Sequence, residues 1–331
     1  MSRDSKAASE LLRIDPGREL DRIAEAIRDL VLRQFRRKGA VLGLSGGIDS
    51  SVVAALCAYA LGKDRVVGIF MPERESAPES LMFGHLLTEN LGIRSFIEDI
   101  SGILDGAACY RRRDDAIRRV VPEYTDEYKC KLVMPDLLAE DRYAIFSIAV
   151  ESPTGETRKV RLSLDAYLGI VAASNFKQRT RKMIEYYHAD ALNFAVAGTP
   201  NRLEYDLGFF VKGGDGLADF KPIAHLYKSQ VYQLAKYLGI PEAIQKRTPT
   251  TDTYSLSQSQ EEFYFSMPLE DMDLCLYGKE NGKHPHEMAP ILGLTEAQVV
   301  RAYAAIEGKR RMAHYLHRAP VVFADGIAVA H

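Results

Sequence analysis

The sequence predicts an α/β fold in which a doubly wound parallel sheet lies between two helical layers. Apolar strand segments at 41–44, 65–71 and 94–97 alternate with helical segments, and the connections between them are short. Such alternation is typical of a parallel sheet covered on both faces, whose ligands bind at the carboxyl ends of the strands. The turn after the first of these strands is rich in glycine and hydroxyl groups. We therefore expect a ligand site at this turn.

The helices of the first hundred residues carry recognisable start and stop signals. Asp15 opens a helix whose apolar residues recur at helical spacing, and Gly62 ends the helix that follows the glycine-rich turn. Ser76 and Glu79 predict a capping box for a helix that ends near 90–92. These helices are expected to cover the sheet.

Residues 106–164 are predicted to be an insertion into the α/β pattern. A basic cluster is followed by a less regular stretch to about residue 142, and the segments 143–150 and 159–164 predict a β-hairpin. We expect the cluster to form a solvated helix face and the hairpin to serve dimer contacts or to cover a site. The cluster consists of Arg111, Arg112, Arg113, Arg118 and Arg119.

A long helix is predicted at 168–191, and a strand follows at 194–197. Four cations of this helix lie within two turns and form either a solvated basic face or a site for anions. Thr199 and Glu204 follow the strand, so both should lie beside the glycine-rich turn. The four cations are Lys177, Arg179, Arg181 and Lys182.

Two later segments have the composition of ligand-binding elements. The segment 209–219 holds three glycines, two acids and Lys212, which suits a clamp on a ligand. A helix at 225–238 places Lys228 in its first turn, where the helix dipole disfavours a cation, so we expect Lys228 to meet an anion. The polar loop that follows this helix is expected to cover the site.

The chain as a whole is predicted to form a single domain over residues 1–331. Residues 269–331 are interpreted as a helical C-terminal extension, in which Thr295 and Gln298 predict a capping box. No apolar run approaches the roughly 20 residues that span a bilayer, and the N-terminus lacks the apolar core of a signal peptide. We therefore expect a cytoplasmic protein without a membrane partner.

Charge and cysteine usage exclude some classes of function. The formal net charge of -2 gives no electrostatic reason to expect nucleic acid as the main partner. The four cysteines stand far apart without a C-x-x-C pair, so they are predicted to be buried free thiols instead of metal or sulfur-relay ligands. They are Cys57, Cys109, Cys130 and Cys275.

The glycine-rich turn at 43–50 has the layout of a phosphate cradle. Glycines let a ligand approach the backbone closely, and the N-terminus of the following helix offers N–H groups to an anion. Asp49 is itself an anion, so it is interpreted as a ligand of a Mg²⁺ ion that carries the phosphates of ATP. The 43–50 turn lacks the Gly-Lys-Ser/Thr ending of a Walker loop. It consists of Gly43, Leu44, Ser45, Gly46, Gly47, Ile48, Asp49 and Ser50.

These motifs resemble a known family. Ser-Gly-Gly-Ile-Asp-Ser-Ser at 45–51 is similar to the pyrophosphate loop of ATP pyrophosphatases, which split ATP between its α- and β-phosphates. With the basic helix, the glycine-rich segment and the late lysine Lys309, the chain resembles ammonia-dependent NAD synthetases over about 21–104 and 168–311. The resemblance implies a three-layer α/β/α fold of the adenine nucleotide alpha hydrolase-like type.

The resemblance also implies roles for individual residues. Asp49 and Glu204 would hold Mg²⁺, and Asp49, Lys228 and Asp219 would be catalytic, with Asp219 orienting or deprotonating ammonium. The residues implied to bind ATP are 43–50, Thr199, Lys228 and Thr250. The residues implied to bind deamido-NAD are Arg179, Lys212, Asp219 and Lys309.

The chemistry of the family has two steps. The nicotinate carboxylate attacks the α-phosphorus of ATP and releases pyrophosphate, and ammonia then displaces AMP from the acyl-adenylate to give NAD. The resemblance implies ATP and Mg²⁺ as co-substrate and metal, a homodimer, and ammonia that is either free or delivered by a separate protein.

Departures from the family pattern leave alternatives open. Gly308 stands where histidine is common, the residues 252–255 differ from the acidic loop usual in the family, and the 106–164 insertion is foreign to compact members. A related ATP pyrophosphatase that amidates a different carboxylate is therefore an alternative. A tRNA-modifying relative is disfavoured by the missing cysteine pair, and a non-enzymatic paralogue by the presence of Asp49, Glu204 and Lys228.

Overall fold

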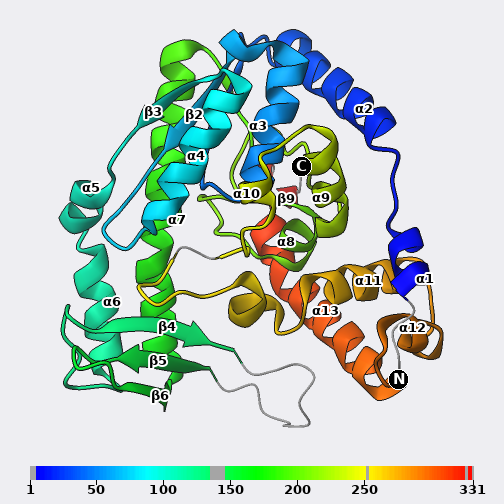
Figure 1. The fold of residues 1–331 in the computed structure, drawn as a ribbon. Helices are drawn as coiled ribbons and strands as arrows, with labels where there is room; N and C mark the ends of the chain where they lie inside the picture. Colours follow the sequence, from blue (N-terminus) through cyan, green and yellow to red (C-terminus); the bar gives the residue numbers. More distant parts are fainter. Residues whose placement is uncertain (1–4, 135–145, 251–252, 325–326, 330–331) are drawn as a thin grey trace.

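A computed structural model describes residues 5–134, 146–250, 253–324 and 327–329 of the chain. Its central sheet has four parallel strands in the order β3–β2–β1–β7 (Figure 1). The chain runs outward through β2 and β3 and then returns to place β7 on the other side of β1, so the sheet is doubly wound, as predicted. The carboxyl end of β1 lies at the point where the strand order reverses. The strands are β1 (Ala40–Gly43), β2 (Val66–Phe70), β3 (Arg94–Ile97) and β7 (Ala195–Val196).

Strand β1 is buried on both faces, and its side chains alternate between two cores. Leu42 packs in the core beneath α2, α3 and α9, whereas Val41 packs in the core beneath α7. The two helical layers confirm the predicted class. The helices over the sheet are α2 (Pro16–Arg28), α3 (Ile48–Leu61), α4 (Pro78–Leu91), α7 (Leu164–Leu192) and α9 (Lys228–Tyr237), and short helical turns η1 (Asp29–Gln34) and η2 (Lys63–Arg65) follow α2 and α3.

The predicted capping box before α4 is wrong. The Ser76 hydroxyl accepts a hydrogen bond from the Glu73 amide (3.1 Å), and the N-cap of α4 is Ala77, which makes no side-chain cap. Pro78 sets the start, because proline is favoured at the first helical position and holds the residue before it in an extended conformation.

The region 106–164, which is predicted to be an insertion and is called the insertion below, contains more regular structure than expected. Strands β4, β5 and β6 form a three-stranded antiparallel sheet, which includes the predicted hairpin. Helix α6 carries most of the basic cluster, as the predicted helix face requires, and β4 lies in the stretch expected to be less regular. The start of the predicted hairpin, at 143–145, lies outside the described residues. The elements of this region are α5 (Ser101–Gly106), α6 (Cys109–Arg118), β4 (Lys129–Val133), β5 (Ser147–Glu151) and β6 (Thr157–Arg161).

The basic cluster was predicted to form a solvated helix face, but only part of it is solvated. Arg111 and Arg112 are exposed, but the Arg113 side chain is 5% exposed and forms ion pairs with Glu75 (2.6 Å) and Asp114 (2.8 Å). Helical spacing places Arg113 on the buried face of α6, so its charge had to be paired inside the protein.

The C-terminal third forms its own core against α1 and α8. Met272, Val299 and Ile306 are buried in it. The capping box of Thr295 and Gln298 is confirmed. The remaining elements of the chain are α1 (Ser5–Leu11), α8 (Arg202–Leu207), α10 (Glu242–Gln245), η3 (Glu261–Phe265), α11 (Leu269–Glu280), α12 (Pro285–Leu292), α13 (Glu296–His317), β8 (Val322–Ala324) and β9 (Ile327–Val329).

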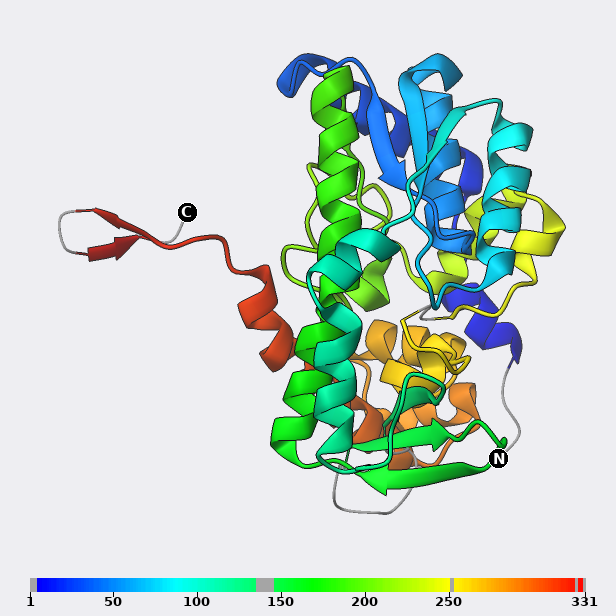
Figure 2. The same ribbon diagram turned by 90° about the vertical axis from the view of Figure 1, so that its left-hand side faces the viewer.

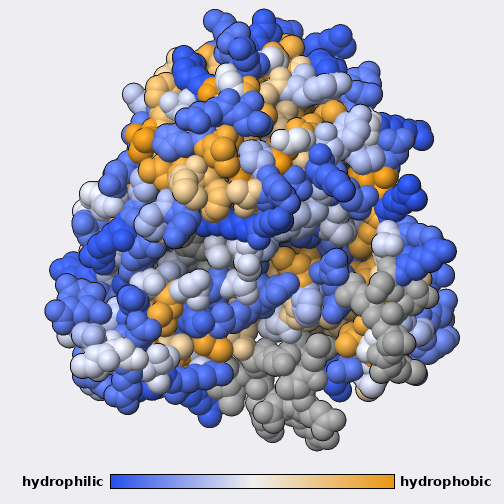
Figure 3. Space-filling view, in the orientation of Figure 1, coloured by the Kyte–Doolittle hydropathy of each residue, from blue (hydrophilic) through white to orange (hydrophobic). Residues whose placement is uncertain are grey.

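The C-terminal hairpin and α4 are two of the surfaces with exposed apolar side chains. Figure 2 shows the C-terminal hairpin of β8 and β9 extending away from the body of the protein, and Phe323 on this arm is 78% exposed. Hydrophobic residues also gather over α4 on the face seen in Figure 3, where Met82 and Leu86 are exposed. The four cysteines are buried and free, as predicted, and among the described residues no helix is long and apolar enough to cross a membrane.

Substitution of Arg113 tests the buried ion pairs. Arg113→Met should lower the free energy of unfolding by about 3–5 kcal/mol, because it leaves Glu75 and Asp114 buried without this partner. The exposed Arg111 offers a matched control, for which Arg111→Met should change the free energy by about 0.5 kcal/mol or less. Urea denaturation followed by circular dichroism measures both values. Equal stability of the two variants would contradict the role given to Arg113.

Candidate functional site

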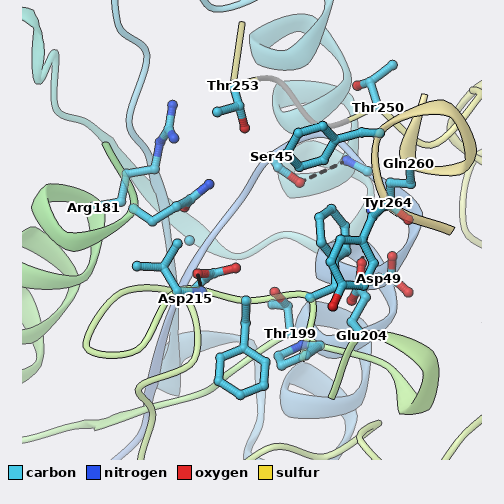
Figure 4. Close-up of a pocket in the computed structure, with 18 of the residues that line it drawn as sticks. Ser45, Asp49, Arg181, Thr199, Glu204, Asp215, Thr250, Thr253, Gln260 and Tyr264 are labelled. Atoms are coloured by element: carbon cyan, nitrogen blue, oxygen red, sulfur yellow. Dashed lines mark hydrogen bonds between the residues drawn. The ribbon is translucent and has the colours of Figure 1, made fainter. Parts of the chain in front are cut away.

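A cavity of about 900 Å³ lies where β1 and β2 end. The 43–50 turn, α7, the segment after β7, the loop 247–264 and α13 contribute to its wall. In Figure 4, Asp49, Glu204 and Thr199 lie on one side of this cavity, and Arg181 and Asp215 lie on the other. The cavity therefore stands at the edge of the sheet where the sequence predicts a ligand site.

Two carboxylates and one ammonium group meet at the 43–50 turn. Lys228 forms an ion pair with Asp49, and the Lys228 side chain is 3% exposed. Glu204 is buried within electrostatic reach of both. The prediction that Lys228 meets an anion is confirmed, and that anion is Asp49.

Neighbouring polar groups hold these three side chains in place. Asn201 donates its side-chain amide to Asp49 Oδ1 (3.1 Å), and its backbone amide donates to Glu204 Oε2 (3.1 Å). Gln260 donates to Glu204 Oε1 (2.9 Å). Asp273 of α11 accepts hydrogen bonds from the backbone amides of Lys228 (3.1 Å) and Ser229 (2.8 Å), and thus caps α9.

Asn201, Gln260 and Asp273 were not among the predicted site residues. Asn201 follows Thr199 in the sequence and precedes Glu204 by three residues, which is a capping-box spacing that could have indicated it. Asp273 lies 45 residues beyond Lys228. No local pattern connects them.

Burial and charge shift the proton affinities of the site. Burial, and then the charge of Asp49, raise the pKa of Glu204 to about 8. Burial opposes the charge of Lys228, but the Asp49 and Glu204 carboxylates outweigh it and raise the pKa of Lys228. One buried ammonium group, that of Lys228, therefore faces the carboxyl groups of Asp49 and Glu204. Its single positive charge cannot balance two negative charges if both carboxyl groups are ionised.

The structure brings most of the predicted site residues to the cavity wall. Gly46 and Asp219 are the exceptions among them. The predicted residues that line the cavity are Gly43, Leu44, Ser45, Gly47, Ile48, Asp49, Ser50, Arg179, Thr199, Glu204, Lys212, Lys228, Thr250 and Lys309.

Gly46 shapes the 43–50 turn from behind. Its φ of +69° lies in the left-handed region that favours glycine, and a Cβ placed there would stand 2.4 Å from the Ser80 carbonyl oxygen. The turn can therefore pack against α4 only with glycine at this position.

Asp219 lies outside the cavity wall and is occupied by other partners. Its carboxylate accepts hydrogen bonds from the Val196 amide (2.7 Å) and the Tyr186 hydroxyl (3.1 Å). Asp215, the other acid of this glycine-rich segment, does line the cavity. Its carboxylate accepts a hydrogen bond from the Val211 amide (2.8 Å), and burial raises its pKa.

Lys309 is a buried cation at the α13 side of the cavity. Its ammonium group donates to the Tyr264 carbonyl (2.7 Å) and lies 3.7 Å from the centre of the Tyr264 ring. Within the described chain it has no ion pair with a carboxylate. Burial lowers the pKa of Lys309 to about 8, although the carbonyl and the ring face both favour the charged form.

The cations of α7 are divided between buried pairs and the cavity. Lys182 pairs with Glu185 (2.7 Å), whereas Lys177 pairs with Glu75 (2.6 Å) and Glu73 (2.8 Å). Neither lysine lies on a solvated face. Arg179 is exposed and donates to the Lys212 carbonyl (3.3 Å).

The insertion and α7 together hold the segment 253–264 in the cavity wall. Lys177 donates to the Thr253 carbonyl (2.8 Å). Strand β4 contacts the same segment through the Cys130 amide, which donates to Ser255 (2.9 Å), and through an ion pair of Lys131 with Glu262 (2.7 Å). The insertion therefore supports the site, although only a few of its residues, Leu132 among them, line the cavity.

The chain matches the NAD synthase family model over residues 19–119 and 148–313. This chain belongs to the NAD synthase family. It is 56% identical over 312 residues to the NH(3)-dependent NAD(+) synthetase of Mesorhizobium japonicum, with 94% of this chain and 98% of that protein covered. The family match, like the site, includes the 43–50 turn, Glu204 and Lys228.

Solved structures agree with the fold. The NMN synthetase of Francisella tularensis superimposes with a TM-score of 0.65 at 21% identity, covering 94% of this chain and 99% of that one. The NH3-dependent NAD synthetase of Campylobacter jejuni gives a TM-score of 0.61 at 23% identity, covering 94% and 100%. Both structures share the α/β/α fold that the sequence resemblance implied.

The raised pKa of Glu204 predicts how stability depends on pH. Folded protein keeps the Glu204 proton up to about pH 8, whereas the unfolded chain loses it near pH 4.5, so stability should fall as pH rises from about 5 to 8. Relative to Glu204→Gln, the wild-type protein should lose on the order of 2–4 kcal/mol over this range. Chemical denaturation at each pH, in metal-free buffer, measures the difference.

The exposed acid Glu79 gives the matched control. Glu79→Gln should remain parallel to wild type at every pH, because this carboxyl group is exposed. If Glu204→Gln also ran parallel to wild type, Glu204 would be ionised in the folded protein and the explanation by burial would be wrong.

Proposed function

We propose that this chain makes NAD by joining ammonia to deamido-NAD at the expense of ATP, with AMP and pyrophosphate as the other products. The observation that carries the proposal is the match, nearly end to end and at more than half identity, to proteins named NH(3)-dependent NAD(+) synthetases. The cavity at the switch point of the sheet supports it, because it combines a phosphate cradle with several cations. An acceptor other than deamido-NAD is not favoured by relatives this similar.

The acidic pair of Asp49 and Glu204 fits a magnesium ion. Two carboxylates share one ammonium group, and burial with mutual repulsion disfavours their joint ionisation. Among the described residues no group of three or more His, Cys, Asp or Glu side chains could hold a metal. A two-carboxylate set suits Mg²⁺, which takes its other ligands from phosphates and water. When bound, Mg²⁺ would neutralise phosphate charge during the displacement.

The chain's own groups supply binding and orientation. We propose that the 43–50 turn and the N-terminus of α3 bind the phosphates of ATP, with Thr199 and Thr250 as further contacts. Lys228, held by Asp49 and by the Asp273 cap, stays charged and stabilises the charge that develops on the phosphates. Arg179, Lys212 and Lys309 bind the anionic dinucleotide.

In this proposal Asp219 is a positioning residue and not a catalytic one. Its hydrogen bonds to Val196 and Tyr186 fix the end of β7 and the glycine-rich segment beneath the cavity. Asp219 therefore holds the substrate-binding segment in place, and direct contact with ammonium is not part of the proposal.

The proposed reaction is tested by its products. The protein is incubated with ATP, Mg²⁺, ammonium and deamido-NAD, and AMP, pyrophosphate and NAD are measured together. All three should form in equal amounts. Formation of ADP, or of AMP with other acids but never with deamido-NAD, would overturn the proposal.

Asp49→Asn tests the acidic pair. Turnover should fall at least about 100-fold, because the amide neither neutralises Lys228 nor offers a carboxylate to the metal. Asp64→Asn, at an exposed position, is the matched control and should retain wild-type rates. Near-normal turnover of a folded Asp49→Asn would contradict the assignment.

Lys309 predicts a pH dependence of substrate binding. Because its pKa is about 8, the ammonium group should lose its proton above that pH, and its attraction to the dinucleotide should weaken. The KM for deamido-NAD should rise about tenfold above pH 8 in wild type, and it should be high and flat in Lys309→Met. Steady-state kinetics from pH 6.5 to 9.5 measure this, with the exposed Arg311→Met as control. Parallel pH profiles for wild type and Lys309→Met would contradict it.

We further propose that the protein is a cytoplasmic homodimer that takes free ammonia or ammonia from a separate protein. Exposed apolar side chains on α7 and α13, which include Met183, Tyr187, Met312 and Tyr315, support a protein contact surface. The four free thiols suit a reducing compartment. Sedimentation analysis would determine the oligomeric state.

A further inference from the structure

We propose that Arg247 is a further phosphate ligand, which binds the β- and γ-phosphates of ATP and then the departing pyrophosphate. The inference rests on the proposed function and adds to it a residue that lies outside the predicted set. Arg247 lines the cavity together with Ser45 and Gly47.

The guanidinium group of Arg247 bridges two elements beside the 43–50 turn. It donates to the Ser45 carbonyl (3.2 Å) and to the Ser80 hydroxyl on the first turn of α4 (2.8 Å). A Cβ built on Gly46 would lie 3.1 Å from Arg247 Nη1. The positive charge therefore lies directly against the backbone that is proposed to bind phosphate.

The Arg247 side chain keeps donors for an anion. Within the described residues it has no ion pair with a carboxylate, in contrast to Lys228 and Lys182 in the same cavity wall. A guanidinium group has five N–H donors, and the two hydrogen bonds to Ser45 and Ser80 use two of them. The Phe83 ring, 5.4 Å from the guanidinium carbon, helps to fix the plane.

The chemistry of the reaction places an anion beside this group. As the nicotinate carboxylate oxygen bonds to the α-phosphorus, the bond from that phosphorus to the bridging oxygen breaks, and the electron pair leaves on pyrophosphate. Charge therefore grows on the β-phosphate, where a fixed guanidinium group stabilises it. The acyl-adenylate retains only the α-phosphate, so Arg247 should bear on ATP and pyrophosphate and not on AMP.

Binding measurements with two ligands separate this role from a general effect on the fold. Calorimetric titration with Mg²⁺-pyrophosphate should show affinity at least tenfold lower in Arg247→Met, while the affinities for AMP and deamido-NAD stay within twofold of wild type. Arg247→Lys should be intermediate, because lysine keeps the charge but lacks the planar fork. The neighbouring Lys246 is exposed and paired with Glu242, so Lys246→Met is the matched control and should bind pyrophosphate like wild type.

The outcomes decide between the roles. Unchanged pyrophosphate affinity in a folded Arg247→Met, or in Arg247→Lys if the first variant does not fold, would overturn the inference. Equal losses for AMP and pyrophosphate would also overturn it, since they would indicate a distorted 43–50 turn. If the wild-type protein binds pyrophosphate through Arg247 but forms no NAD, the proposed function fails and the phosphate ligand remains.

Discussion

The organisation of this site depends on the placement of one buried lysine between two carboxyl groups. Lys228 comes from α9, Asp49 from the first turn of α3, and Glu204 from α8, so three separate elements converge on a few atoms. A buried ammonium group is costly unless it is paired, and a second carboxyl group beside the pair adds repulsion. The arrangement is therefore stable only if the elements are fixed from outside, and Asn201, Gln260 and Asp273 provide that fixation.

In the proposed function, the excess of carboxyl groups over cations at this centre favours the binding of a further cation. Raising the pKa of Glu204 to about 8 means that a proton occupies the carboxyl group at neutral pH in the absence of other cations. A divalent cation brought by ATP would replace that proton and relieve the repulsion. In the proposed function, the same carboxyl and ammonium groups would be better compensated with metal and triphosphate bound, so nucleotide binding would also complete the charge balance of the site.

The sequence predicted the parts of this structure that depend on local patterns. The strand 94–97 and the capping box of Thr295 coincide with the observed elements, since periodicity and capping chemistry are read from a few adjacent residues. The 43–50 turn was predictable for the same reason. By contrast, Asp273 and Arg247 reach their partners only through the fold, because the residues they contact lie 44 or more positions away.

Charged residues show most clearly why the remaining predictions failed. Arg113 and Lys177 were expected on a solvated helix face or as anion ligands. A run of cations in the sequence does not show which side chains face the interior and which face the solvent. In the structure both face inward and share Glu75, whose pKa is held below its ordinary value by Lys177 and Arg113 against the opposing effect of burial. Which cation is buried depends on where the acids of another segment lie.

The region 106–164 supports the cavity wall through contacts with the segment 253–264. Strand β4 and Lys177 hold the segment 253–264, because the Cys130 amide donates to the Ser255 hydroxyl and the Lys177 ammonium group donates to the Thr253 carbonyl. That segment carries Gln260 to Glu204 and Tyr264 to Lys309. The contacts of β4 with this segment therefore support Gln260 and Tyr264, which in turn contact Glu204 and Lys309 in the cavity wall. The described residues 253–255, which belong to the stretch expected to differ from the family pattern, are thus held by β4 and by Lys177.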